Sequence, residues 1–197
     1  EPFYRAGAAE IPPTPDPVRI LVLGCGTGLE LDEIFARTPN ARIAGIDLAP
    51  NMLEQLRAKF PARMDQMTLV VGNYLDVPLG EREYDYAVSC LTVHHLPWEQ
   101  KAIVYRKTFA ALKDRGLYVE GDQSCLPEQE GHYWYHEFVS KLPGGDRGAW
   151  NYDVTLSVET NTRLLLEAGF SGVRQTWESR DDAGNGHAVL VADRGRP

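Results

Sequence analysis

The fold of this chain is decided by one segment, Val22-Leu23-Gly24-Cys25-Gly26-Thr27-Gly28. The apolar run 19–23 predicts a buried strand, and the apolar spacing over about 29–37 predicts an amphipathic helix after the turn. Glycines between a strand and a helix let backbone N–H groups and the helix N-terminus come close to a ligand. The segment therefore predicts a strand–turn–helix unit that holds a polar ligand.

Short β-branched runs alternate with longer helical patterns along the chain, which is typical of parallel βαβ units. We expect strands at 19–23, 41–46, 67–71, 84–90 and 117–120, helices at about 29–37, from Pro50, from Pro97 and at 157–168, and a terminal antiparallel hairpin of 173–178 and 187–192. The predicted fold class is α/β: a doubly wound, mostly parallel seven-stranded sheet with a C-terminal antiparallel hairpin and helices on both faces.

Burial can be predicted from the same patterns. The strands at 67–71 and 84–90 are too uniformly apolar for a sheet with one solvent-exposed face, so we expect helices to cover both of their faces. The helix from Pro50 is expected to carry Met52, Leu53 and Leu56 on its inward face. The helix from Pro97 carries an apolar stripe as well. Its inward residues are expected to be Ile103, Val104, Phe109 and Leu112, with Gly116 as its cap.

Composition limits the function classes. With 43% hydrophobic and 24% charged residues, the 197-residue chain is expected to form one globular domain. The net charge of −8 opposes contacts with nucleic-acid phosphates. No apolar run approaches the roughly 20 residues of a membrane span, and no secretory signal is visible in the sequence. Three cysteines far apart predict neither a disulfide frame nor a zinc ribbon, so a reducing cytoplasm is the expected compartment.

Polar residues follow the next two predicted strands. Asp47 closes the second strand 19 residues after Gly28, where a carboxylate can accept hydrogen bonds from both hydroxyls of a ribose. Gly72-Asn73-Tyr74 follows the third strand and offers an amide for an adenine edge and an aromatic ring for its face. Because ligands bind at the carboxyl ends of the strands in open α/β sheets, these features predict an adenosine cofactor.

Together these motifs resemble the class I S-adenosylmethionine-dependent methyltransferases. The resemblance covers about residues 18–120 and rests on four motifs in order: Leu23 to Gly28, Gly45-Ile46-Asp47-Leu48 followed by Asn51-Met52-Leu53, Gly72-Asn73, and Tyr84-Asp85 leading through Val88-Ser89-Cys90 to His94-His95-Leu96. Each motif is weak alone, and the four at this spacing are strong together. The third-strand glycine is often followed by Asp in the family, so Asn73 is expected to read the adenine amino group through its amide oxygen.

The resemblance implies methyl transfer from S-adenosylmethionine to a small-molecule acceptor by in-line displacement. It implies a cofactor site made of Gly24, Cys25, Gly26, Gly28, Asp47, Leu48, Asn73, Tyr74 and Cys90. Residues 1–197 are expected to be a single methyltransferase domain, with a cofactor core at 18–120, an acceptor-site lid at 121–157 and a C-terminal helix and hairpin at 158–197. Tyr4 is expected to belong to an N-terminal cap, and the chain to act as a monomer or homodimer.

Acid–base candidates lie beyond the fourth and fifth strands. A histidine at position 94 or 95, beside the transferred methyl group in this family, could take a proton from a nucleophile, and His95 is favoured over His94. Glu120, Asp122 and Asp153 are expected near the rim, where carboxylates would attract a cationic or amine acceptor. Asp122 is the first choice among them, and ordinary packing or solvation is the alternative for each of the five residues.

The segment from Gly131 to Lys141 predicts an amphipathic lid helix with Tyr133, Trp134, Tyr135 and Phe138 facing an acceptor pocket or packing on the sheet edge. His132 and His136 have a metal-ligand spacing of i and i+4. The glutamate of H-E-x-x-H is missing and no third ligand is evident nearby, so no metal is expected. Asn151-Tyr152-Asp153-Val154 resembles a substrate-rim segment of some small-molecule methyltransferases.

Two other functions remain open at this point. A nucleotide-cofactor oxidoreductase would use a similar glycine turn, but the dinucleotide fingerprint needs its third glycine three positions after the second, and position 29 is Leu. A non-catalytic relative would keep the fold and the cofactor pocket as a binding module. The intact cofactor motifs disfavour the second alternative, and only turnover excludes it.

Overall fold

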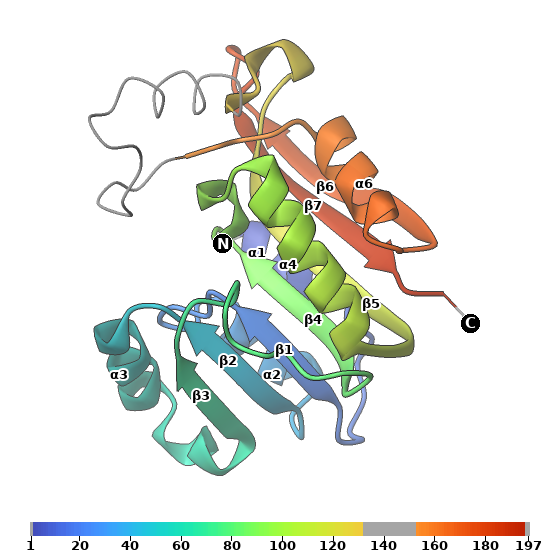
Figure 1. The fold of residues 1–197 in the computed structure, drawn as a ribbon. Coiled ribbons are helices and arrows are strands. Elements are labelled where there is room, and N and C mark those ends of the chain that lie inside the picture. Colours follow the sequence, from blue (N-terminus) through green and yellow to red (C-terminus); the bar gives the residue numbers. More distant parts are fainter. Residues whose placement is uncertain (1, 132–152, 196–197) are drawn as a thin grey trace.

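A computed structural model of the chain describes residues 2–131 and 153–195. Its sheet has seven strands in the order β3-β2-β1-β4-β5-β7-β6 (Figure 1). The strands are β1 (Arg19–Leu23), β2 (Arg42–Asp47), β3 (Met67–Val71), β4 (Tyr84–Cys90), β5 (Leu112–Ser124), β6 (Gly172–Arg180) and β7 (Gly186–Asp193). The first five pair in parallel, and β7 runs antiparallel to both β5 and β6. The predicted fold class is confirmed.

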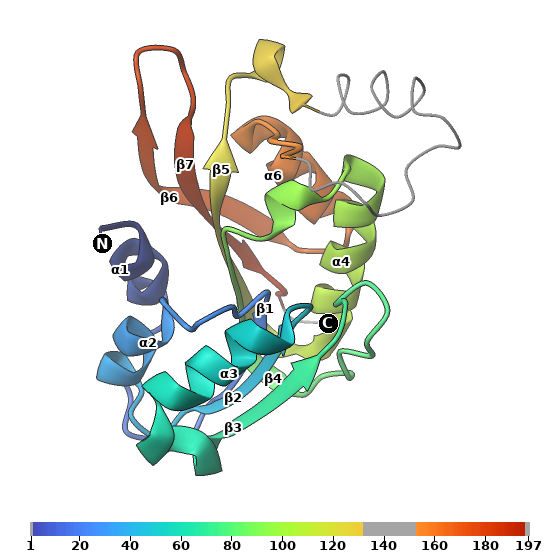
Figure 2. The same ribbon diagram turned by 90° about the vertical axis from the view of Figure 1, so that its left-hand side faces the viewer.

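Helices lie on both faces of the sheet (Figure 2). The α-helices are α1 (Pro2–Ala9), α2 (Leu31–Arg37), α3 (Pro50–Lys59), α4 (Trp98–Ala111) and α6 (Val158–Glu167), and the 3₁₀ turns are η1 (Pro61–Gln66), η2 (Val93–His95) and η3 (Pro127–Gln129). Residues of α1, α2 and α3 form one hydrophobic core, and residues of α4 and α6 form the other. The sheet is therefore the middle of three layers.

Strand β1 shows why both cores form. Ile20 and Val22 belong to the core with α1, α2 and α3, whereas Leu21 and Leu23 belong to the core with α4 and α6. All four side chains are at most 1% exposed, and each such burial contributes roughly 1.5–3 kcal/mol to folding. The strand is apolar at successive positions because alternate side chains enter different cores.

The outer strand β3 departs from the prediction. Val70 and Val71 are 37% and 51% exposed, so the expectation that this strand is buried on both faces is wrong. The reason is its place at the edge of the sheet, beyond β2. In the neighbouring helix α3, Leu53 and Leu56 are buried as expected, whereas Met52 is 40% exposed. The prediction that Met52 faces inward is therefore wrong.

The connection from α4 to β5 also differs from the prediction. Helix α4 ends at Ala111, and Gly116 lies inside β5 rather than at a helix cap, so Leu112 belongs to the strand. Arg115 takes the left-handed conformation with φ +64°. A Cβ on Gly116 would lie 2.8 Å from the carbonyl oxygen of Lys113, so this glycine serves a tight bend. Ile103 of α4 is 42% exposed, so the prediction that it faces inward is wrong.

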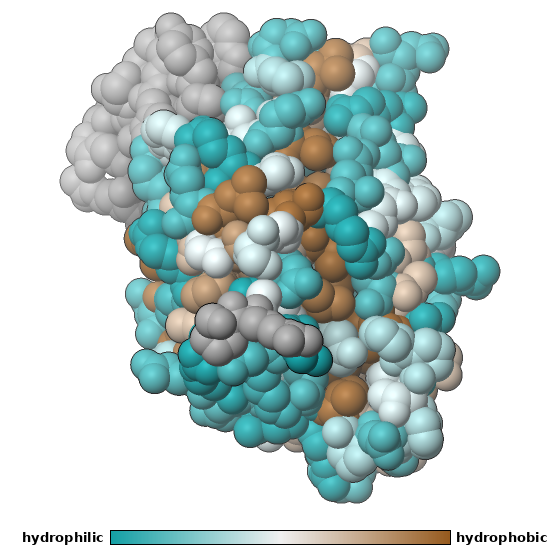
Figure 3. All heavy atoms as spheres, turned by 90° about the vertical axis from the view of Figure 1, so that its right-hand side faces the viewer, coloured by the Kyte–Doolittle hydropathy of each residue, from teal (hydrophilic) through white to brown (hydrophobic). Residues whose placement is uncertain are grey.

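The C-terminal helix and hairpin follow the prediction. Ser157 caps α6 by accepting the backbone N–H of Thr160 at 3.1 Å, and Gly169 ends the helix with φ +115°. Strand β6 forms the other edge of the sheet and carries Arg174 and Glu178. Charged side chains of this kind protect an edge strand from pairing with another chain. Hydrophilic residues cover most of the surface on the side of α6 (Figure 3).

Several predictions fall on residues 132–152, outside the described part of the chain. They are the lid helix beyond Gly131, its four aromatic residues, the His132 and His136 pair, and Asn151-Tyr152. Among the described residues, no helix combines the length and apolar character needed to cross a membrane.

Candidate cofactor and acceptor site

A cavity of about 630 Å³ lies at the carboxyl ends of β3, β2, β1 and β4. Strand β1 sits between β2 and β4, and the chain crosses to opposite sides of it, which is the switch point where open α/β sheets bind ligands. Eight of the nine predicted cofactor residues line the cavity: Gly24, Cys25, Gly26, Asp47, Leu48, Asn73, Tyr74 and Cys90. The sheet therefore brings residues from four separate predicted motifs to one place.

Asp47 holds the glycine turn in position. Its Oδ2 accepts the backbone N–H of Gly26 at 2.7 Å, and its Oδ1 accepts the backbone N–H of Ala49 at 2.9 Å. Each carboxylate oxygen has a further lone pair, so Asp47 can still accept hydrogen bonds from two ribose hydroxyls. The same contacts fix the side chain before any ligand arrives.

Two glycines of the turn have different tasks. Gly24 has φ +61°, and a Cβ there would lie 2.1 Å from Oγ1 of Thr92, so no other residue fits this part of the cavity wall. Gly28 is the predicted cofactor residue that does not line the cavity. Its φ is +70°, and a Cβ there would lie 2.9 Å from Leu31 and 3.1 Å from Phe60, so Gly28 serves helix packing.

Asn73 and Tyr74 line the cavity but also bind the protein itself. Asn73 Oδ1 accepts the backbone N–H of Leu75 at 2.9 Å, which fixes the amide and leaves one lone pair on the oxygen for an adenine amino group. The hydroxyl of Tyr74 lies 3.3 Å from both the carbonyl oxygen and Oγ1 of Thr92. Burial raises the pKa of Tyr74 to about 12, so its hydroxyl stays protonated.

Glu30 is a cavity residue that the sequence analysis did not identify. Its side chain is 5% exposed at the start of α2, and Oε1 has no hydrogen-bond partner among the described residues. Burial raises the pKa of Glu30 to about 7, although its own backbone N–H and the charge of Lys59 act in the opposite direction. A buried carboxylate without a partner favours a cationic ligand group in the cavity. The signal for this residue in the sequence is an acidic side chain two positions after the last glycine of the turn.

Cys90 and Cys25 line the cavity as neutral thiols. Burial and the nearby charge of Glu30 raise the pKa of both side chains well above the ordinary thiol value. Neither group is therefore an activated nucleophile. Leu91 follows with φ +50°, a strained conformation for a leucine, and its backbone N–H donates to the carbonyl oxygen of Gly121 at 2.9 Å.

His94 and Asp122 form a buried pair beside the cavity. Nδ1 of His94 lies 2.5 Å from Asp122 Oδ1, while Asp122 Oδ2 accepts the backbone N–H groups of Val93 and His94 at 2.9 and 3.1 Å. Burial alone would raise the pKa of Asp122, but the hydrogen bond and charge of His94 and the charge of Lys101 lower it below the usual value. Asp122 is thus an ionised residue that orients His94.

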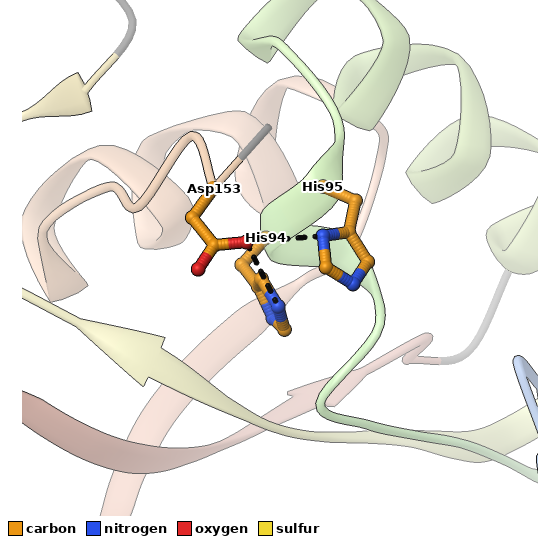
Figure 4. Close-up of side chains that lie close together, drawn as sticks. All are labelled: His94, His95 and Asp153. Carbon is orange, nitrogen blue, oxygen red and sulfur yellow. Dashed lines mark ion pairs between the residues drawn. The ribbon is translucent and has the colours of Figure 1, made fainter. Parts of the chain in front are cut away.

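His95 lines the cavity, whereas His94 does not. Asp153 lies against both histidines: its Oδ1 is 3.2 Å from Nδ1 of His95 and 3.7 Å from Nε2 of His94 (Figure 4). The backbone N–H of Val154 donates to the carbonyl oxygen of His94 at 2.6 Å and holds the segment there. Four predicted acceptor-end residues are therefore brought together: His94, His95, Asp122 and Asp153.

Glu120 and Asp122 do not lie on a solvated rim, so that expectation is wrong. Both are at most 3% exposed, because the second half of β5 lies between β4 and β7. Glu120 accepts hydrogen bonds from the hydroxyls of Tyr105 and Tyr118 at 3.0 Å each. Burial raises the pKa of Glu120 to about 7, with the charge of the fully buried Lys101 acting against it.

The residues that line the cavity suit S-adenosylmethionine in their chemistry. Gly24 lets Thr92 pack against the glycine turn, Asp47 offers acceptors for a ribose, and the unpartnered Oε1 of Glu30 suits a cationic group. Leu48 and Met52, exposed at 70% and 40%, supply apolar wall, as an adenine ring requires. Tyr4 of α1 also lines the cavity, in keeping with the expected cap.

Comparison with known proteins agrees with this geometry. Residues 20–116 match the family described as a methyltransferase domain. The chain is 28% identical over 165 residues to the demethylmenaquinone methyltransferase of Staphylococcus aureus strain JH9, and the match covers 76% of this chain and 66% of that protein. The strain Newman protein matches equally. The chain therefore spans slightly less than two thirds of the length of these relatives.

Solved structures share the fold at low identity. The YcgJ protein from Bacillus subtilis superposes with a TM-score of 0.73 at 12% identity, over 99% of this chain and 98% of that one. A geranyl diphosphate methyltransferase in complex with S-adenosylmethionine gives a TM-score of 0.72 at 14% identity, over 97% and 84% of the two chains. At such identities the likeness concerns the fold alone.

Proposed function

We propose that this chain, a member of the class I S-adenosylmethionine-dependent methyltransferases, transfers a methyl group from S-adenosylmethionine to a small-molecule acceptor. The observation that carries the proposal is the cavity at the switch point, where Gly24, Asp47 and Asn73 meet from the ends of three neighbouring strands. Its volume of about 630 Å³ lies within the range of ligand pockets for small molecules.

Three parts of the cofactor each have a proposed partner in the cavity. Asp47 accepts hydrogen bonds from the ribose hydroxyls, and Asn73 accepts one from the adenine amino group. Glu30 pairs with the ammonium group of the methionine portion, which gives its Oε1 the partner that it lacks. When bound, the cofactor supplies a methyl group on a positively charged sulfur, which is the leaving group when a nucleophile attacks the methyl carbon in line.

The acceptor is proposed to enter beside His95. This residue lines the cavity, and its neighbours His94 and Asp153 extend the polar wall beyond it. Alignment of the acceptor atom with the methyl group supplies much of the acceleration in such a displacement. Asp122 is proposed as a positioning residue that acts through His94, because it is buried and does not line the cavity.

Two observations support a small-molecule acceptor. The relatives named above are methyltransferases for demethylmenaquinone and geranyl diphosphate, both small molecules by their names. The net charge of −8 disfavours a nucleic-acid substrate. The nucleophilic atom of the acceptor, whether O, N, S or C, stays open.

Turnover tests the proposal against a non-catalytic relative. The protein is incubated with methyl-labelled S-adenosylmethionine and fractionated small-molecule extracts, and label is followed into the extract and into S-adenosylhomocysteine. We expect label in one small-molecule fraction, and a loss of transfer in Asp47→Ala. Tight cofactor binding without label transfer to any fraction would instead assign the chain to a binding module.

A further inference from the structure

Three side chains beside the cavity place potential metal ligands around one point. Asp153 Oδ1 lies 3.2 Å from Nδ1 of His95 and 3.7 Å from Nε2 of His94, and one ligand atom from each residue lies within 4.8 Å of the others (Figure 4). Tetrahedral zinc with bonds of about 2.0–2.1 Å places its ligands roughly 3.4 Å apart. The two distances from Asp153 are therefore close to the separation of ligands around such an ion.

Asp122 prepares His94 for this role. When the ring is neutral, Asp122 accepts the hydrogen bond of Nδ1–H, and the lone pair of the ring is then on Nε2, the nitrogen that faces Asp153. A carboxylate behind the second ring nitrogen is the usual way in which metal-binding histidines are oriented and made more basic. Two backbone N–H groups fix Asp122 in turn, so the ring of His94 has one defined orientation.

The turn and the segment that enters α6 bring the second histidine and the carboxylate close to His94. The ring centroids of His94 and His95 are 4.0 Å apart, because the two residues follow one another in the turn η2. The hydrogen bond from Val154 N–H to the carbonyl oxygen of His94 fixes the backbone next to Asp153.

We propose that His94, His95 and Asp153 bind a first-row divalent transition-metal ion such as Zn²⁺, with Asp122 as the outer carboxylate. Two imidazoles and one carboxylate suit such ions, whereas Mg²⁺ and Ca²⁺ prefer oxygen ligands throughout. His95 also lines the cavity, so the ion lies at its edge, where an acceptor oxygen or nitrogen completes the coordination. This last role rests on the proposed function, and metal binding itself does not.

The test is a calorimetric titration of chelator-treated full-length protein with zinc chloride, without S-adenosylmethionine. We expect one equivalent of Zn²⁺ to bind, and magnesium chloride to give no binding heat at the same concentrations. Asp153→Asn and His95→Ala change a side chain that is exposed or partly exposed, and each is expected to weaken binding at least tenfold. Asp122→Asn is expected to weaken it 10- to 100-fold through the orientation of His94.

Two control variants locate the ion. His187→Ala removes a histidine of β7 outside the cluster, and the double variant His132→Ala/His136→Ala removes the i, i+4 pair noted in the sequence. Both are expected to bind Zn²⁺ like the unchanged protein, and thermal unfolding checks that all variants fold. No Zn²⁺ binding, binding that survives Asp153→Asn and His95→Ala, or binding lost only in the double variant would overturn the proposal. Cofactor titration of the same samples shows separately whether the methyltransferase site is intact.

Discussion

The backbone N–H of Gly26 donates to Asp47 Oδ2 at 2.7 Å, so the acid that ends β2 holds the glycine turn that follows β1. Two neighbouring strands are thereby joined at the point where their carboxyl ends face the cavity. The proposed binding of a ribose by Asp47 is consequently linked to the shape of the turn.

Asp47→Asn is expected to weaken S-adenosylmethionine binding by about 10-fold or more and Asp47→Ala by about 100-fold or more, since hydrogen bonds to a charged group contribute roughly 1.5–3 kcal/mol each. The amide keeps one oxygen acceptor, and alanine keeps none. Calorimetric titration measures both. Asp181→Ala, in the turn between β6 and β7, is the control and is expected to bind normally. Equal affinities for all three variants would remove Asp47 from the site.

Gly24→Ala is expected to lower the free energy of unfolding by about 2 kcal/mol or more, because the residue has φ +61° and its Cβ would meet Thr92. Gly172→Ala is the matched control, because a Cβ there meets no atom within 4 Å, and its effect is expected within about 0.5 kcal/mol. Urea unfolding measures both changes. Similar losses in the two variants would show that the wall at Gly24 can adjust.

Glu30 predicts a pH dependence of cofactor binding. With a pKa of about 7, the ionised fraction of Glu30 rises from roughly one tenth at pH 6 to nine tenths at pH 8. An ammonium group pairs with the ionised form, so affinity for S-adenosylmethionine is expected to rise about tenfold over this range. Calorimetry at pH 6, 7 and 8 measures the change, and Glu30→Gln is expected to give a flat profile. A rise that persists in Glu30→Gln would assign the effect to another group.

The same residue predicts the sign of a stability change. The folded-state pKa of Glu30, about 7, lies above its ordinary value of 4.5, so between these pH values the folded protein binds more protons than the unfolded chain. The contribution of Glu30 to the free energy of unfolding is therefore present below pH 4.5 and is lost as the pH rises to 7. Urea unfolding of the protein and of Glu30→Gln isolates this contribution, and the difference between them is expected to change in this direction.

Lys101 and Glu120 predict a coupled effect on stability. Lys101→Met is expected to cost about 3 kcal/mol at pH 8, because it leaves the buried charge of Glu120 without its cation, and less at pH 6, where Glu120 is mostly protonated. Adding Glu120→Gln is expected to recover part of the loss and remove its pH dependence. Unfolding curves of the single and double variants measure this, and strict additivity would contradict the coupling.

Much of the fold follows from local patterns in the sequence. The strands at Met67–Val71 and Tyr84–Cys90 have the predicted bounds, since each is an apolar run between turn residues. The burial of β3 was not predictable from its own sequence, because an edge strand and a central strand can have the same composition. Its place in the sheet depends on the order of all seven strands.

The residues proposed to bind the cofactor could be predicted to lie together, because they follow consecutive strands at a characteristic spacing. The positions of the residues proposed for the acceptor were harder to predict. Asp153 and His94 are 59 positions apart, and their contact depends on the path of the chain after β5. The sequence predicts that Glu120 and Asp122 lie near the rim of the acceptor site. Strand β7 instead pairs with this part of β5, and both residues are buried. Such burial follows from tertiary pairing rather than from local pattern.

Calorimetric titration with S-adenosylmethionine, S-adenosylhomocysteine and NAD tests the central claim most directly. We predict micromolar binding of both sulfur cofactors by the unchanged protein, its loss in Asp47→Ala, and no binding of NAD. Binding of NAD without binding of either sulfur cofactor would contradict the account and assign the glycine turn to a dinucleotide.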